Sequence, residues 1–143
     1  MVATKTAPVT KEEALAVVYD FFKHFQTWIS TAKAPSQTEL ERYLSPQFKI
    51  TSNGNLIGRN AADYLSRAKK LLEKYSRFEI SKPLEEPIHS GNEIALYYRV
   101  DLTPKNGGAP KQVYIFALGT IEDHHIARWT QVTHQQGTGD WDK

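Results

Sequence analysis

Three segments with alternating apolar residues follow one another between Glu93 and His134. They read EIALYYRVDL, KQVYIFALGTI and HIARWTQVTHQ. An apolar residue at every second position is typical of a β-strand, in which successive side chains point to opposite faces of a sheet. Turn-forming segments separate them, TPKNGGAP at 103–110 and the polar residues 122–125. The pattern therefore predicts three long antiparallel strands in series.

The first of these strands has two faces of different character. One face is apolar throughout and carries Ile94, Leu96, Tyr98, Val100 and Leu102. The other carries Ala95, Tyr97, Arg99, Asp101 and Thr103, so a guanidinium and a carboxylate can meet there. On a surface open to water such an ion pair contributes roughly 0–1 kcal/mol. In a closed cavity each charge is costly unless the two satisfy one another, and such a pair usually has a function.

Upstream of this region, capping residues and helical spacing predict three helices. The first follows a capping box that runs from Thr10 to Glu13. A second capping box, from Ser36 to Glu39, opens a short helix, and Asn60 is the N-cap of the third. The apolar positions of the first helix form two adjacent stripes, so we expect it to pack against the sheet as the main plug of the core. One stripe is Leu15, Val18, Phe22, Phe25 and Ile29, and the other is Val17, Phe21, His24 and Trp28.

Shorter strands complete the predicted fold. Phe48–Thr51 and Leu56-Ile57 flank the tight-turn pair Asn53-Gly54, and 77–80 is a further short strand. The fold class is α+β, a cone in which helices pack on the concave side of a curved antiparallel sheet and enclose an internal pocket. We expect a single domain over residues 1–143, with a loose N-terminal arm at 1–9 and a polar tail at 136–143.

The composition argues against several classes of partner and binding site. The 143 residues have a net charge of +2 and no basic cluster longer than a dipeptide, which argues against nucleic acid as a partner. There is no cysteine and therefore no thiolate chemistry. We expect no cofactor and no metal, since the adjacent His124 and His125 would point in opposite directions in a strand. No signal peptide and no apolar run of about 20 residues is present, so we expect a cytoplasmic protein without a membrane partner.

Three short motifs, in this order and spacing, resemble the nuclear-transport-factor-2-like superfamily and, within it, the SnoaL-like proteins. They are Leu-Ser-Pro-Gln-Phe at 44–48, Gly-Arg-Asn-Ala at 58–61 and Ile-Ala-Arg-Trp at 126–129. The resemblance extends from Lys11 to Gln135. It implies the cone fold, and a superfamily that contains isomerases, cyclases, epoxide hydrolases and non-catalytic binding modules.

Arg99-Val100-Asp101 is similar to the run that holds the arginine and the acid catalyst of the limonene-epoxide-hydrolase branch. The same resemblance implies that Phe22, Phe25 and Trp129 are pocket walls. The branch's second aspartate is Gln131 here, and its water-holding tyrosine and asparagine correspond to Ile50 and Ser52. Gln131 cannot take a proton from water at neutral pH, so the same hydrolysis is not expected. The isomerase branch would need a carboxylate near residues 51–52, where there is none.

Two hypotheses follow. In the first, the chain binds a small hydrophobic organic molecule in its pocket, with Asp101 as general acid or base and Arg99 holding it in place. Tyr97 would then contact the ligand beside the four other predicted ligand-binding residues, Phe22, Phe25, Trp129 and Gln131. In the second, the chain is a homodimeric, non-catalytic binding module and Arg99–Asp101 is a structural ion pair. Its dimer surface would be formed by Leu96, Tyr98 and Val100, with Tyr114 and Phe116 as neighbours.

Overall fold

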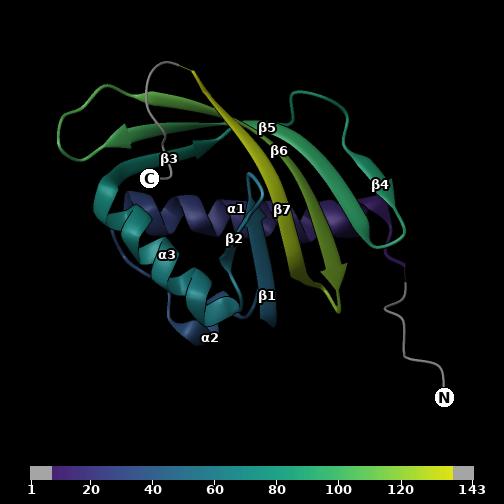
Figure 1. Cartoon of the computed structure of the whole chain (residues 1–143). Helices are drawn as coiled ribbons and strands as arrows, with labels where there is room; N and C mark the ends of the chain where they lie inside the picture. Colours follow the sequence, from purple (N-terminus) through teal and green to yellow (C-terminus); the bar gives the residue numbers. More distant parts are fainter. Residues whose placement is uncertain (1–7, 137–143) are drawn as a thin grey trace.

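The computed structural model describes residues 8–136, and the rest of the predicted arm and tail lies outside them. Within these described residues three helices and seven strands follow one another (Figure 1). They are α1 (Lys11–Ser30), α2 (Gln37–Leu40), β1 (Leu44–Ser52), β2 (Asn55–Gly58), α3 (Ala61–Lys74), β3 (Tyr75–Ile80), β4 (Ile88–Ser90), β5 (Glu93–Pro104), β6 (Lys111–Glu122) and β7 (His125–Gln136).

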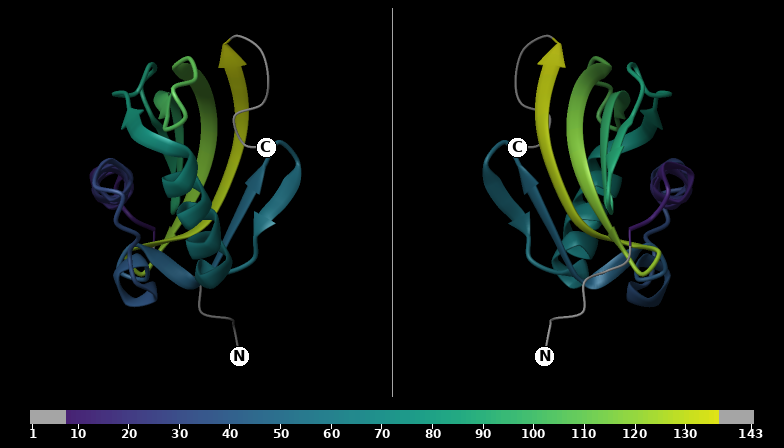
Figure 2. Two further views of the ribbon diagram at one scale, coloured as in Figure 1. Left: turned by 90° about the vertical axis from the view of Figure 1, so that its left-hand side faces the viewer. Right: turned by 90° about the vertical axis from the view of Figure 1, so that its right-hand side faces the viewer.

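The strands form one curved sheet in the order β2-β1-β7-β6-β5-β3, with β4 also paired to β5. The predicted series β5, β6 and β7 is antiparallel, and Figure 2 shows these long strands bending along their length. The sheet is mixed, because β1 pairs with β7 in parallel. Sequence patterns did not indicate this pairing, since it joins segments about eighty residues apart.

The helices begin where the capping residues predict. Thr10 and Glu13 form both hydrogen bonds of a capping box at α1, Ser36 and Glu39 do the same at α2, and Asn60 caps α3. Each cap satisfies backbone N–H groups that the helix itself leaves unpaired. Within residues 8–136 no helix is long and apolar enough to cross a membrane.

Helices α1 and α3 lie on the concave side of the sheet and share one hydrophobic core with it (Figures 1 and 2). The buried face of α1 is formed by Ala14, Val18, Phe21, Phe25, Trp28 and Ile29, drawn from both predicted stripes. Val9, from the segment predicted to be a loose arm, also packs against the core, and its N–H donates to the carbonyl of Gly91. The α+β cone predicted from the sequence is therefore confirmed, with one parallel strand pair added.

Candidate ligand-binding cavity

A mostly apolar cavity lies where α1 and α3 meet the concave face of the sheet. Its volume is about 60 Å³, room for roughly four water molecules. Aromatic side chains from α1, α3 and four strands pack around it, as in the edge-to-face pair of Phe48 and Tyr64, whose ring centroids are 5.3 Å apart. The lining residues are Phe21, Phe22, Phe25, Leu44, Phe48, Ile50, Tyr64, Arg67, Leu71, Phe78, Ile80, Tyr98, Val100, Ile115, Ile126, Trp129 and Gln131.

Part of the cavity wall is polar and internally hydrogen-bonded. The indole Nε1 of Trp129 donates to Oε1 of Gln131 at 3.1 Å, and Nε2 of Gln131 donates to Oγ of Ser52 at 3.2 Å. The indole nitrogen can only donate, so it fixes the amide oxygen of Gln131 on its own side. Gln131 and Ser52 are the buried polar residues of the described chain. Because their polar atoms are paired, the network orients the cavity wall without an unsatisfied group.

Strand pairing explains why these three side chains meet. Gln131 and Ser52 are register partners in the parallel pair β1·β7, and Trp129 lies two residues before Gln131 on the same face of β7. Gly119 of β6 lies opposite Trp129. A Cβ atom at Gly119 would come within 2.8 Å of the Trp129 ring, so the glycine makes room for the indole.

Two tyrosine side chains add neutral polar groups to the lining. Tyr64 of α3 and Tyr98 of β5 are both almost fully buried. Burial raises the pKa of both phenols well above the ordinary value. For Tyr98 the charge of Tyr64 acts in the same direction, and a hydrogen bond with Trp129 acts against it. At neutral pH both groups therefore keep their protons and can donate hydrogen bonds.

The cavity contains four of the seven site residues predicted from the sequence. Phe22, Phe25, Trp129 and Gln131 line it. The ring of Phe22 lies 5.1 Å from that of Tyr98 and 5.9 Å, edge-on, from that of Trp129. Arg99, Asp101 and Tyr97 are not among the lining residues.

The predicted placement of Arg99 and Asp101 in the cavity is wrong, because the opposite face of β5, which carries Tyr98 and Val100, packs inward. Tyr98 and Val100 are buried in the core, so Tyr97, Arg99 and Asp101 project from the convex face and are half-buried. Arg99 and Asp101 do form the predicted pair, with Nε–Oδ1 at 2.9 Å and Nη2–Oδ2 at 3.2 Å. About a third of each side chain is exposed, so solvent screens the pair.

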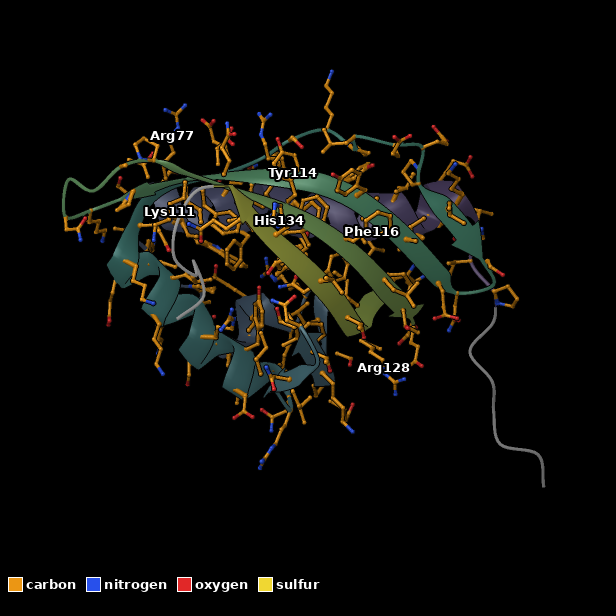
Figure 3. The ribbon with its side chains drawn as sticks, turned by 45° about the horizontal axis from the view of Figure 1, so that its top comes forward. Arg77, Lys111, Tyr114, Phe116, Arg128 and His134 are labelled. Atoms are coloured by element: carbon orange, nitrogen blue, oxygen red, sulfur yellow. The ribbon has the colours of Figure 1, made fainter. Side chains whose placement is uncertain are left out.

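The inward orientation of this face of β5 also corrects the predicted dimer surface. Leu96, Tyr98 and Val100 are core residues, whereas Tyr114 and Phe116 lie on the convex face, as Figure 3 shows. Phe116 stacks on Tyr97 with ring centroids 4.9 Å apart. We call the apolar residues gathered here the convex patch: Tyr97, Tyr114, Phe116, Leu118 and Val132. Phe116 and Val132 are 58% and 62% exposed.

The polar lining residues that were not identified from the sequence are Tyr64, Arg67 and Tyr98. Tyr64, Arg67 and Leu71 are spaced three and four residues apart, which places them on one face of α3. That spacing could have identified Arg67 as a residue of the inward side of α3. Tyr98 could be assigned only after the inward face of β5 was known.

The lining is short of groups that exchange protons near neutral pH. Among the lining residues the structure describes, Arg67 is charged and none is Asp, Glu, His, Cys or Lys. Across residues 8–136, no three His, Cys, Asp or Glu side chains gather closely enough to hold a metal ion.

No family model and no curated protein matches the sequence. Solved structures do match. An LEH-like epoxide hydrolase from M. tuberculosis superposes with a TM-score of 0.68 and 15% identity, over 86% of this chain and 84% of that chain. A SnoaL-like polyketide cyclase from Jannaschia sp. CCS1 gives 0.66 and 15%, over 93% and 90%. An NTF2-like protein of unknown function from Cytophaga hutchinsonii gives 0.60 and 14%, over 93% and 95%.

Superpositions at such low sequence identity establish the fold and leave the chemistry open. The chain has the nuclear-transport-factor-2-like cone fold of the SnoaL-like proteins, as its sequence motifs predicted.

Proposed function

We propose that this protein binds a small, largely apolar organic molecule in the cavity between α1, α3 and the sheet. The observation that carries the proposal is the polar part of the cavity lining, where Trp129 and Gln131 are held by a hydrogen-bonded arrangement that continues to the buried Ser52 and is surrounded by apolar lining residues. Sites for small molecules typically combine an apolar lining with a few fixed polar groups. The ligand-binding roles predicted for Phe22, Phe25, Trp129 and Gln131 are part of the proposal.

The cavity favours binding over proton-transfer catalysis. A general acid or base needs a titratable group within hydrogen-bond reach of the ligand. The described lining residues include no carboxylate and no imidazole. Catalysis by Asp101 and Arg99 is not part of the proposal, since both side chains project from the opposite face of the sheet.

The size of the cavity limits the ligand. At about 60 Å³ it accommodates a body of a few carbon atoms, and an aromatic ring or a polycyclic skeleton would require core side chains to move. We therefore expect ligands much smaller than a polyketide or a steroid.

A thermal-shift screen of small apolar alcohols, ketones, amides and acids tests this function. A ligand at 100 times its dissociation constant stabilises the folded state by about 2.7 kcal/mol, which raises Tm measurably. Val100→Phe would fill the cavity, whereas Val132→Phe adds the same bulk on the exposed convex face. We expect binding to be lost in the first variant and kept in the second. A screen without hits, or hits that survive Val100→Phe, would count against the proposal.

The convex patch favours a second function, that of a homodimerising module. Phe116, Leu118 and Val132 are exposed next to the stacked pair of Tyr97 and Phe116. An exposed apolar cluster on a sheet face is typical of an interaction surface. This role is compatible with ligand binding, because the patch and the cavity lie on opposite faces of the sheet. A cytoplasmic location and the absence of a nucleic-acid partner stay predictions from composition.

A further inference from the structure

The cavity contains one positively charged group whose partner is missing from the described residues. Arg67 of α3 is half-buried and lines the cavity. Within residues 8–136, none of the salt bridges involves Arg67. Asp63, one turn earlier on α3, uses its carboxylate to accept the backbone N–H of Arg59 at 3.1 Å. A guanidinium at an apolar cavity without a carboxylate beside it is suited to an anionic group from outside the protein.

The neighbouring polar groups are also suited to a hydrogen-bond acceptor. Tyr64 lies three residues before Arg67, on the same face of α3, and its hydroxyl is neutral and able to donate. Tyr98 contributes a second neutral hydroxyl from β5. The described lining contains no carboxylate that would repel an anion. The cavity is therefore cationic and rich in donors, a composition that an acceptor-rich anion complements.

We propose that the ligand is a small organic carboxylate. Its apolar body fills the cavity, and its carboxylate pairs with the guanidinium of Arg67, with the Tyr64 hydroxyl as a second donor. Arginine suits this task because its planar fork can form two parallel hydrogen bonds with a carboxylate. The inference rests on the function proposed above and adds the chemical class of the ligand.

Matched pairs of acid and amide test the proposal. Butyrate and butyramide, or isovalerate and isovaleramide, share a small apolar body and differ in charge at neutral pH. Dissociation constants are measured by calorimetry or ligand-observed NMR with the unmodified protein, Arg67→Gln and Arg59→Gln. Arg59→Gln is the matched control, because it removes the same charge from an exposed residue outside the cavity lining.

We expect the unmodified protein to bind each acid about tenfold more tightly than its amide, or better. Arg67→Gln should remove that preference and leave the amide affinity unchanged, which also shows that the variant is folded. Arg59→Gln should keep the preference. Equal affinity for acid and amide in the unmodified protein would overturn the carboxylate proposal while the cavity proposal stands. Loss of the preference in Arg59→Gln would also overturn it, because net charge would then be the cause. Failure of every acid and amide to bind would overturn both proposals.

Discussion

At the scale of single residues, the hydrogen bond between Trp129 and Gln131 is the contact on which the cavity wall depends. Trp129→Phe removes the donor and leaves the buried Gln131 oxygen unpaired, and Gln131→Leu removes the acceptor of the indole N–H, which then has only Tyr98 as a partner among the described residues. Each unpaired buried group costs about 1–3 kcal/mol. The double variant removes both groups. We therefore expect the stability losses of the two single variants to add up to at least about 1 kcal/mol more than the loss in the double variant.

Urea unfolding of the four proteins in this double-mutant cycle gives the coupling energy. Thr130→Val, on the exposed side of the same strand, serves as a control for changes in strand propensity. Additive losses would show that the indole and the amide act independently.

The buried tyrosines predict how stability changes at high pH. Burial raises the pKa of Tyr64 and Tyr98 in the folded state, whereas the unfolded chain titrates near 10. Above that pH the unfolded state loses these protons first, so each group lowers the free energy of unfolding by about 1.4 kcal/mol per pH unit. Below pH 9 neither group contributes to the pH dependence.

Tyr98→Phe should therefore make the alkaline fall in stability shallower by that amount. Chemical denaturation at several pH values between 9 and 11 measures the slope. Tyr97→Phe, on the half-exposed convex face, is the control. A slope that Tyr98→Phe leaves unchanged would contradict the assignment of Tyr98 as a buried, neutral phenol.

At the scale of the secondary-structure elements, β6 and β7 are fitted to one another at Gly119 and Trp129. A methyl group at Gly119 would approach two ring atoms of Trp129 to 2.8 and 2.9 Å. The indole is enclosed by the core and cannot move freely, so Gly119→Ala should cost about 1–3 kcal/mol.

The same substitution should disturb the cavity, because the displaced indole forms part of its wall. We expect a shift in tryptophan fluorescence and a loss of ligand binding together with the loss of stability. Leu118→Ala, at the neighbouring exposed position, should stay within about 0.5 kcal/mol. A fully stable Gly119→Ala protein with unchanged fluorescence would disprove the close fit.

Sequence patterns predicted the elements well where the signal is local. Thr10, Ser36 and Asn60 cap their helices because each bonds to N–H groups within a few residues. Local patterns do not determine which face of β5 packs inward, since that depends on which side of the sheet α1 and α3 cover. Tyr98 and Arg99 are equally compatible with either side of an isolated strand, so alternation alone could not place Arg99 and Asp101.

In the candidate site, too, some residues were predicted from the sequence and others depend on tertiary packing. Aromatic side chains such as Phe22 and Trp129 were predicted through the resemblance to the limonene-epoxide-hydrolase branch, and both line the cavity. Arg67 was missed, because a charged residue on an amphipathic helix is ordinarily solvated. Its neighbourhood is created where residues of α3, β1 and β3 line one cavity, and helical spacing alone does not show what packs against that face.

At the scale of the whole molecule, the two faces of the one sheet differ in what covers them. The concave face is covered by helices and encloses the cavity, whereas no helix within residues 8–136 covers the convex face, which carries the convex patch (Figures 2 and 3). A sheet face is self-complementary under a two-fold axis, so two copies could bury the patch together. The half-exposed pair of Arg99 and Asp101 lies beside Tyr97 and Tyr114 and would then belong to the rim of the interface.

Phe116→Glu tests this dimer. A charge placed at the centre of an apolar interface should raise the dissociation constant at least about 30-fold, the effect of removing a hot-spot residue worth about 2 kcal/mol. Leu56→Glu introduces the same charge at another exposed leucine, 53% accessible on β2, and should leave the dimer unchanged. Sedimentation from 1 to 100 µM separates the outcomes: an unmodified protein that is monomeric throughout, or a dimer that tolerates glutamate at Phe116, would show that the patch does not join two copies. If the dimer forms and Phe116→Glu dissociates it while ligand binding persists, the convex face serves assembly independently of the cavity.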